Sequence, residues 1–525
     1  MQISHHLKLF WNAGILFLCL HAGNSRGEDV QSVGIARTLA GDPDIFTDSF
    51  EGVPAPPDLV VINPAVSNPN LAPNETFVLS ATAGNQGGLD SAATTLRYFR
   101  SPDMVITVGD IELGTDAIPA LAKGEESAQS LTTNAPDVED TFWVGACVDV
   151  VPDEEITDNQ CSDGVQIEVA IPPDSDGDRL PDFVETNTGV FVDANDTGTD
   201  PNDPDTDGDS IDDGDEVLGT PDGLDLPAMG TNPLRKDLLL EYDWFDDSND
   251  CSAHSHRPTA NAIARVNTAF ANSPVTNPGP TNGVNLISDY GQGGAFTGGN
   301  LINDADGVIA GGVTGSDYQN YKVANFASNR NGYFHYVLLP HRYNTDSSSS
   351  GQAELPGDDM IVSLYCAGSN RNVANTIVHE LGHNLFLRHG GDQNCNYKPN
   401  YNSVMNYRYQ FPGVDDNCTP PGDGVLDFSY GDRISLNENN LNEFNGTCGP
   451  GFTWDWDDDS TIENPVTVNI NQYDSEAGQC GGTLSTLNDY DDWSNIFFGG
   501  IGDADDPQYP VEIITEQPVP LEYRD

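Results

Sequence analysis

Residues 379–389, with the sequence HELGHNLFLRH, combine side chains that could bind a metal ion and use it. On a helix, His379 and His383 lie one turn apart on the same face, so both imidazoles can reach one divalent ion. Glu380 then points at the open position of the ion, where a carboxylate can take a proton from a water molecule. His389 comes six residues after His383, so the chain must turn back beyond the helix to deliver a third imidazole.

The helix that positions these side chains is predicted from apolar spacing. Four apolar residues recur at every fourth position and form a core-facing row: Val373, Ile377, Leu381 and Leu385. The two histidines fall on the other side of this helix. Asn370 and Asn372 are candidate N-caps, and Gly390 and Gly391 give the later turn its freedom.

A second motif lies downstream, where residues 403–407 (SVMNY) place a methionine in a tight polar turn two residues before a tyrosine. An HExxH string alone occurs by chance, but the third histidine and this turn make the match specific. The combined pattern resembles the metzincin metallopeptidases, which carry HExxHxxGxxH and a Met-turn. The resemblance implies these roles: His379, His383 and His389 as zinc ligands, Glu380 as general base, Met405 as an apolar floor, and Tyr407 beside the zinc.

Phe386 departs from the metzincin pattern, which has glycine at this position. Glycine lets the chain leave the helix with a positive φ, a conformation that strains a bulky residue. Phe386 must accept that strain, or the helix continues and the turn moves to residues 390–391. The second route would favour Asp392 as the third ligand. We expect His389 to be the ligand, because its spacing and its imidazole match the family.

Two acidic segments, 174–185 and 205–216, carry acids at loop positions 1, 3, 5, 9 and 12. Calcium needs six or more oxygen ligands, and this spacing supplies them. Glycine is fourth rather than sixth in each loop, so the segments resemble thrombospondin type 3 repeats rather than EF-hands. Solvated acidic linkers are the alternative. The predicted ligands are Asp174, Asp176, Asp178, Asp182 and Glu185 in one loop and Asp205, Asp207, Asp209, Asp213 and Glu216 in the other, and Asp200, Asn202 and Asp203 are further candidates.

The N-terminus predicts export. Lys8 precedes the apolar run 9–20, and small residues from Ala22 to Gly27 offer cleavage positions for a signal peptide. The run is too short to span a bilayer, and we expect a secreted protein with no transmembrane segment. Eight cysteines remain beyond the signal, an even number that suggests disulfides. Cys147 and Cys161 are expected to pair, whereas the other six allow fifteen connectivities.

Short strands separated by Pro, Asn and Gly turns fill the region that follows. Five are predicted, at residues 59–62, 76–81, 94–99, 142–147 and 165–169. They predict an antiparallel sandwich, similar to the immunoglobulin-like, adhesion-related (CARDB-like) domains of exported bacterial proteins. A spacer or substrate-binding module and inert padding are equally compatible with this fold.

The fold class is therefore multidomain, with an all-β sandwich, a calcium-binding segment and an α/β metzincin-like peptidase domain. The peptidase domain is predicted to have strands at 237–244, 333–339 and 360–365 and a helix at 260–271. The expected divisions are 1–27 (signal peptide), 28–57 (linker), 58–170 (sandwich), 171–235 (calcium-binding repeats), 236–500 (peptidase) and 501–525 (extended tail).

Composition limits the partners. With 20 Lys and Arg against 83 Asp and Glu, the net charge of −63 excludes a nucleic-acid or anionic-membrane binder. We expect one catalytic zinc, two or more structural calcium ions and a protein or peptide substrate, with surface or matrix contact through the sandwich. The spare histidines His254, His256, His335 and His341 are expected to be hydrogen-bonding residues. No cysteine-switch motif precedes the peptidase domain, so nothing in the sequence predicts how latency would be maintained.

The leading interpretation is a secreted zinc endopeptidase. A calcium-dependent adhesion or matrix protein with an inactive peptidase domain is the alternative. An intact Glu380 argues against that alternative, because the general base is what an inactive domain could most readily lose.

Overall fold

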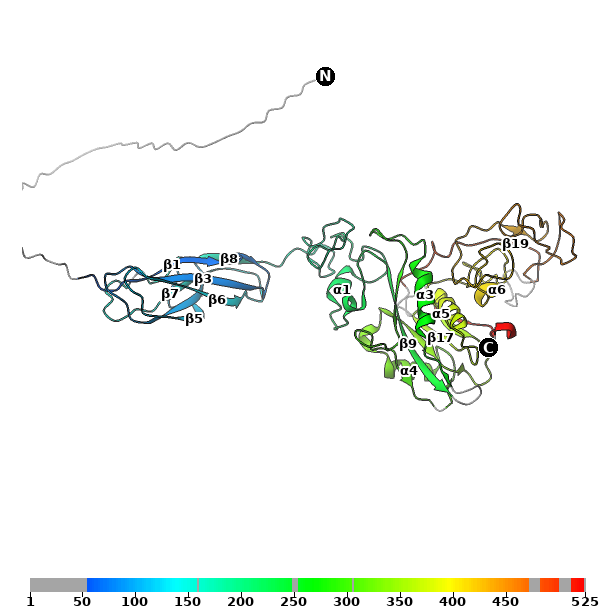
Figure 1. Cartoon of the computed structure of the whole chain (residues 1–525), viewed down its shortest axis with the longest axis horizontal. Coiled ribbons are helices and arrows are strands. Elements are labelled where there is room, and N and C mark those ends of the chain that lie inside the picture. Colours follow the sequence, from blue (N-terminus) through cyan, green and yellow to red (C-terminus); the bar gives the residue numbers. More distant parts are fainter. Residues whose placement is uncertain are drawn as a thin grey trace, which may run out of the picture. The chain divides into compact units, whose positions relative to one another are not determined.

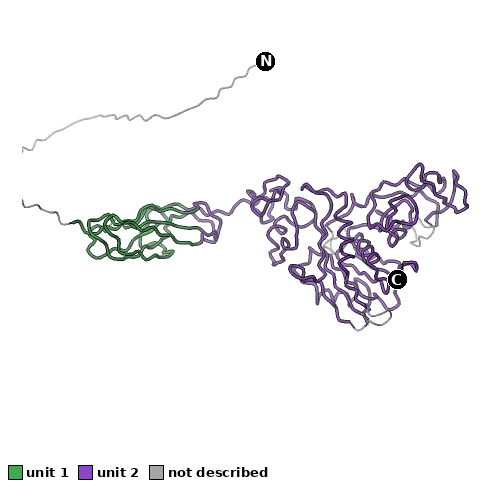
Figure 2. Tube along the Cα trace, in the orientation of Figure 1, with its two compact units in different colours: residues 1–67, 77–133, 142–166 green, residues 68–76, 134–141, 167–525 purple. Residues whose placement is uncertain are grey.

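The computed structural model describes residues 54–157, 160–247, 254–304, 306–471, 482–499 and 511–523. The predicted signal peptide and most of the predicted linker lie outside the described residues, as do Cys19, Cys251 and Cys480. The chain divides into two compact units (Figures 1 and 2), one of residues 1–67, 77–133 and 142–166, the other of residues 68–76, 134–141 and 167–525. Among the described residues, no helix has both the length and the apolar character needed to cross a membrane.

The N-terminal domain is built from strands alone. One sheet has the order β1-β3-β6 and the other β2-β8-β7-β4-β5. Their bounds are β1 Leu59–Val66, β2 Asn70–Leu71, β3 Thr76–Asn85, β4 Thr94–Ser101, β5 Ile111–Ile118, β6 Glu126–Asn134, β7 Asp140–Val148 and β8 Val165–Val169. All five predicted strands are present. The exposed, weakly apolar strands β5 and β6 were missed, because neither carries a strong apolar run.

The second unit is centred on one large sheet with the strand order β10-β9-β14-β17-β16-β20, and with β11 and β12 also paired to β9. Strands β9, β11, β12, β14 and β17 run parallel. At one end β16 runs antiparallel to β17, and β20 runs antiparallel to β16. The short β10 is antiparallel to β9. The bounds are β9 Asp237–Asp247, β10 His254–Ser255, β11 Asn285–Asp289, β12 Leu301–Ile302, β14 Phe334–Leu339, β16 Gly351–Leu355, β17 Asp359–Val362 and β20 Glu512–Thr515.

Helices cover both faces of this sheet. On one face, α3 (Ala260–Ala271) and α5 (Asn370–Asn384) pack on the even-numbered residues of β9, including Leu238 and Leu240. On the other face, α2 (Leu226–Met229) and α4 (Ser316–Asn325) pack on Leu239, Phe245 and Tyr336. The β9 strand is buried on both sides, as its continuous apolar run predicted. Figure 1 shows α3 and α5 side by side over the sheet.

The remaining elements are short and connect these layers. They are α1 Asp213–Leu218, β13 Val308–Ile309, η1 Ser328–Arg330, β15 Arg342–Tyr343, α6 Tyr407–Gln410, β18 Leu436–Asn437, β19 Thr486–Leu487 and η2 Leu521–Tyr523. An extended tail is expected at residues 501–525, and its described part, residues 511–523, contains the extended strand β20 and the short helix η2. Strand β20 pairs with β16, because the free edge of a sheet offers unpaired N–H and C=O groups.

For two disulfides, both cysteines lie among the described residues. Cys147–Cys161 is the predicted pair, and the prediction is confirmed. Cys418–Cys448 is one that the sequence could not select from fifteen connectivities. Cys366 and Cys395 are also disulfide-bonded. The loop-rich region after α5 is therefore held by covalent links as well as by packing.

A buried ion-pair cluster holds the sheet to the η1 turn. Arg330 lies 2.6 Å from Glu241 Oε2 through Nη1 and 2.7 Å from Asp289 Oδ2 through Nη2. Both carboxylates have fully buried side chains, and burial raises the pKa of Glu241 to about 8. Removing the guanidinium would leave two unpaired buried acids, which is far more costly than losing a surface ion pair.

Arg330→Met is therefore expected to destabilise the second unit by about 3 to 5 kcal/mol at pH 8. Arg330→Lys, which keeps the charge but cannot contact both acids through a planar fork, should fall between Arg330→Met and the wild type. Thermal and urea unfolding of the full chain measure the effect. Unfolding curves of Arg330→Met that coincide with the wild type would contradict this account.

Candidate metal centre

Helix α5 delivers the first two histidines as the sequence predicted. Ser369, rather than Asn370 or Asn372, is its N-cap, and the Ser369 side chain accepts the N–H of Asn372. Ile377 and Leu381 are fully buried in the core that α5 shares with α3 and the sheet. His379 and His383 are also fully buried, on the side of α5 that faces the third histidine.

Helix α5 ends at Asn384 with Leu385 as its C-cap, and the next residue, Phe386, accepts the backbone strain. Its φ is 76°, and its position is the one that glycine usually takes in a Schellman motif. The N–H of Phe386 donates to His383 O at 2.9 Å, and the N–H of Leu387 donates to Gly382 O at 2.8 Å. The chain then turns back and brings His389 to the site, whereas Asp392 is exposed. The alternative route with Asp392 as a ligand is not the one that the structure adopts.

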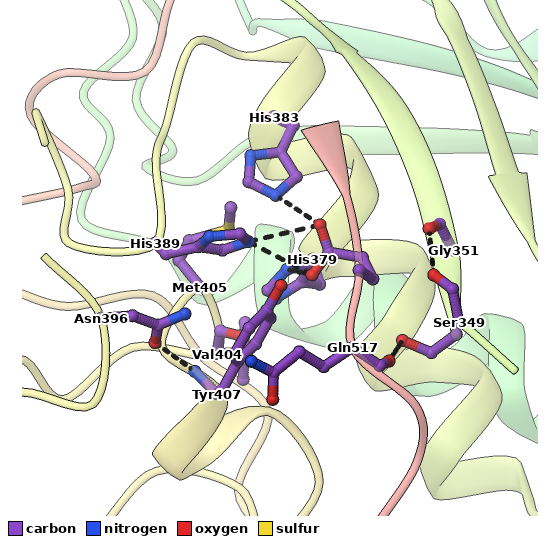
Figure 3. Close-up of polar contacts among 12 residues, drawn as sticks. Ser349, Gly351, His379, His383, His389, Asn396, Val404, Met405, Tyr407 and Gln517 are labelled. Atoms are coloured by element: carbon purple, nitrogen blue, oxygen red, sulfur yellow. Dashed lines mark hydrogen bonds and ion pairs between the residues drawn. The ribbon is translucent and has the colours of Figure 1, made fainter. Parts of the chain in front are cut away.

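The three imidazoles converge through their Nε2 atoms. His379 Nδ1 lies 2.7 Å from Val404 O, and His383 Nδ1 lies 2.7 Å from Leu387 O, so each Nδ1–H donates to a backbone carbonyl. These hydrogen bonds leave Nε2 as the lone-pair atom of both rings and fix their orientation. Figure 3 shows His379, His383 and His389 facing one another above Met405.

Met405 packs against the last turns of α5 at Gly382. It is fully buried, and a methyl group placed on Gly382 would come within 2.3 Å of its sulfur. Glycine at 382 thus lets the methionine approach the helix directly beneath the two histidines. Tyr407, at the start of α6, has its ring centroid 4.4 Å from that of His389 and 5.9 Å from that of His379. The predicted site residues are therefore brought together.

Glu380 is the most unusual carboxylate in the site. Both of its oxygens are fully buried, and neither has a hydrogen-bond partner among the described residues. The carboxylate faces the backbone of β16, since a methyl group on Gly351 would meet Glu380 Oε1 at 2.1 Å. Burial, and then the nearby Glu516 carboxylate, raises the pKa of Glu380 well above its usual value. A group in this state can accept or hold a proton.

Sequence reasoning missed Glu516, which comes from the end of β20. Its carboxylate lies among the three imidazoles, at 2.9 Å from His379 Nε2, 3.2 Å from His383 Nε2 and 3.2 Å from His389 Nε2. The β-branched run at 512–515 could have predicted a strand. No sequence pattern near residues 512–515, however, indicates that this strand lies beside a helix more than 120 residues earlier in the chain.

The three histidines satisfy the requirements of a zinc site. Ligands of one tetrahedral zinc at about 2.0 to 2.1 Å lie about 3.3 Å from one another, close to the observed N–O separations. The potential ligand atoms of these three histidines and of Glu516 all lie within 4.8 Å of one another. Three histidine nitrogens are a donor set that zinc has in catalytic sites, where the fourth position is left to water or substrate.

The first acidic cluster, defined as Asp174, Asp176, Asp178, Glu185 and Asp213, joins the two predicted calcium loops. Asp178, Glu185 and Asp213 lie together and are buried, so Asp213 contributes across loops rather than only to its own. The Asp182 carboxylate instead accepts the N–H and hydroxyl of Ser175 at 2.8 and 2.9 Å and closes its loop. Burial raises the pKa of Asp213 to about 8 and of Glu185 to about 7.

The second acidic cluster consists of Asp205, Asp207, Asp209 and Glu216. The first three lie within ligand distance of one another. Both oxygens of Asp207 and one oxygen of Glu216 are buried without a hydrogen-bond partner among the described residues. Burial raises the pKa of Asp207 to about 7, and Lys236 opposes this. Asp209 also accepts the N–H of Asp237 at the start of β9, so this cluster abuts the large sheet.

The spare histidines divide into two settings. His335 is fully buried beside Asn384, and burial lowers its pKa to about 4, so it is a neutral structural residue. His254, His256 and His341 lie together, with His256 Nε2 3.3 Å from His341 Nδ1. This contact agrees with the expectation that these side chains form hydrogen bonds.

Comparison with known proteins identifies the N-terminal domain. Residues 56–163 match the CARDB family, which confirms the predicted immunoglobulin-like domain. The CARDB domain of a Pyrococcus furiosus protein, solved in complex with di-metal ions, is 18% identical with a TM-score of 0.18, covering 24% of this chain and 100% of that one. A cell surface protein domain of Methanosarcina acetivorans is 18% identical with a TM-score of 0.18, covering 22% and 92%. No curated protein matches the sequence.

The positive φ at Phe386 makes a specific prediction. Phe386→Gly should raise the stability of the full chain by about 1 kcal/mol, because relief of about 1 to 3 kcal/mol of strain exceeds the entropy cost of glycine. Phe386→Ala is the control, since alanine loses the ring but keeps the strain. Thermal unfolding and zinc content by mass spectrometry measure both variants. Phe386→Gly being less stable than Phe386→Ala would contradict this account.

Proposed function

We propose that the protein is a secreted zinc endopeptidase of the metzincin type. The observation that carries the proposal is the convergence of three Nε2 atoms, together with the buried, unpartnered carboxylate of Glu380 on the same helix. The Schellman turn at Phe386 and the Met405 floor support it, since both have counterparts in the HExxHxxGxxH and Met-turn pattern. When bound, zinc would polarise a peptide carbonyl and lower the pKa of a water molecule.

The remaining steps belong to side chains of this chain. Glu380 takes a proton from the attacking water and returns it to the leaving amine, which its burial and raised pKa suit it to do. The hydroxyl of Tyr407 donates a hydrogen bond to the carbonyl oxygen as that atom gains negative charge. His379 and His383 stay in one orientation through their bonds to Val404 and Leu387. The β16 edge can hold an extended peptide by backbone hydrogen bonds.

The substrate is expected to be a protein or peptide. A cavity of about 300 Å³ is lined by Tyr407, Tyr409 and Phe411, and also by residues of the C-terminal segment that include Gln517 and Tyr523, so its shape depends on that segment. Its aromatic lining suits an apolar or aromatic side chain of an extended peptide. A negatively charged substrate is disfavoured by the net charge of −63.

A second role is favoured by the CARDB domain. Immunoglobulin-like domains of this kind suggest adhesion, so the N-terminal domain could hold the enzyme at a surface or in a matrix. This role is compatible with catalysis by the second unit. The alternative of an adhesion protein with an inactive peptidase domain is tested by the same activity measurement.

Replacement of the proposed base tests the catalytic proposal. Glu380→Gln should keep one zinc per chain while casein hydrolysis falls by at least about 10² to 10⁴, the contribution of general-base catalysis. Because the Glu516 carboxylate lies among the imidazoles, the assay uses both the wild-type and the Glu516→Ala background. The peptidase proposal would be refuted if neither the wild-type nor the Glu516→Ala chain, with zinc bound, showed chelator-sensitive hydrolysis. Loss of zinc in Glu380→Gln would assign Glu380 a structural role.

We also propose that calcium occupies the two acidic clusters. Their raised carboxylate pKa values mean that the folded, calcium-free protein binds more protons than the unfolded chain. Its stability should therefore fall as pH rises from about 4 to about 8. Calcium should remove this dependence and raise the unfolding temperature, since it binds the folded state alone.

Asp207→Asn should abolish most of the calcium-induced rise in unfolding temperature. Asp222→Asn, at an exposed acid in the same segment, is the matched control and should leave the rise intact. Differential scanning calorimetry between pH 5 and pH 8, with and without a calcium chelator, supplies the readout. An equal calcium effect in all three chains would place calcium elsewhere.

A further inference from the structure

The C-terminal segment 512–518 occupies the edge of β16 as an extended strand. It runs antiparallel to β16, with Thr515 opposite Gln352 and Glu512 opposite Leu355. Beyond the strand, the N–H of Glu516 donates to Gly351 O at 3.1 Å. The Ser350 N–H and hydroxyl both donate to Gln517 O, at 3.1 and 2.9 Å. The segment therefore uses the hydrogen-bonding groups that an extended peptide substrate would need.

Side chains anchor the segment at both ends of this run. Arg388, one residue before the third histidine, lies 2.7 Å from the Glu512 carboxylate. The Tyr397 hydroxyl donates to Gln517 Oε1 at 2.6 Å. Further along, Asn372 of α5 donates to Tyr523 O at 2.8 Å. The segment is thus held along its described length by residues surrounding the candidate metal centre.

Glu516 is the residue of this segment that faces the imidazoles. Its carboxylate is fully buried and lies within 3.3 Å of all three Nε2 atoms. An ionised acid among three imidazoles needs positive charge, either protons on the rings or a metal ion bound by the Nε2 atoms and the carboxylate together. The convergence of three Nε2 atoms on one carboxylate favours the metal ion. The observed N–O separations match those between ligands that share one tetrahedral zinc.

We infer that Glu516 is a fourth protein ligand of the catalytic zinc and that segment 512–518 is a built-in competitor of substrate. This inference rests on the proposed zinc peptidase. The Glu516 carboxylate takes the position that a water molecule would need, and the backbone of the segment takes the β16 edge. The segment is not cleaved, because the group that faces the imidazoles is a side-chain carboxylate rather than a peptide carbonyl. The full chain is therefore latent until the segment leaves.

Cobalt substitution tests the ligand directly. In the full-length chain with cobalt in place of zinc, the visible spectrum should not change between pH 6 and pH 9, because a carboxylate ligand does not titrate there. In Glu516→Ala a water should take the position, and the spectrum should become pH-dependent as that water ionises. Glu516→Gln is the second variant, which keeps the side-chain shape. Glu522→Gln, at an exposed acid four residues beyond segment 512–518, is the control.

Access to the metal is measured without relying on catalysis. Acetohydroxamate binding, followed through the cobalt spectrum, should be at least about tenfold tighter in Glu516→Ala and Glu516→Gln than in the wild type or Glu522→Gln, since a tethered ligand competes at an effective millimolar concentration. Casein hydrolysis by the zinc forms should rise by a similar factor.

Coincident spectra and equal acetohydroxamate affinities for wild type and both Glu516 variants, at full cobalt occupancy, would overturn the inference even if all chains hydrolyse casein. Spectra and affinities that differ as expected, with no hydrolysis by any chain, would uphold the ligand and overturn the peptidase proposal instead. The two ideas therefore fail separately.

Discussion

The stability of the fold depends on positive charges that compensate its buried carboxylates. With only 20 basic side chains for 83 acids, Lys and Arg are scarce partners for the carboxylates of this chain. Arg330 contacts two buried acids, Glu241 and Asp289, in the large sheet. Glu516 lies among three histidines, and the carboxylates of the two acidic clusters lie beside one another, where an uncompensated buried charge is costly. Metal ions are the cations that we propose for these donor sets, and their binding would couple metal content to folding.

Helix α5 links the packed core to the candidate metal centre. Its buried row fixes it to α3 and the sheet, and its last turn carries His379 and His383. The Schellman turn that follows converts the end of the helix into the start of the loop that returns His389. Strain at Phe386 is tolerated because hydrogen bonds on both sides determine the backbone there.

Two requirements on the edge of β16 conflict, peptide binding and protection from unwanted pairing. An open edge can bind an extended peptide, but it also exposes unpaired backbone groups to unwanted pairing. Segment 512–515 satisfies those groups from within the same chain, and it also brings Glu516 to the imidazoles. Protection of the edge and occupation of the metal centre are thus properties of a single strand, which links the stability of the fold to its proposed latency.

Local patterns in the sequence determined much of this protein. Helix 260–271, five strands of the CARDB domain and the strand at 237–244 were predicted, because apolar periodicity reports which faces are buried. The three histidines and Glu380 were predicted from their spacing, and Met405 and Tyr407 from the resemblance to the metzincins; the structure brings the histidines and Tyr407 together. Tertiary structure alone decided the rest. The choice of His389 over Asp392 required the backbone conformation at Phe386, and Asp213 reached Asp178 only through packing of one loop on another. Glu516 lies 127 residues from His389 in the chain. Its arrival depends on backbone pairing with β16, an interaction that has no local signature because any extended segment can make it.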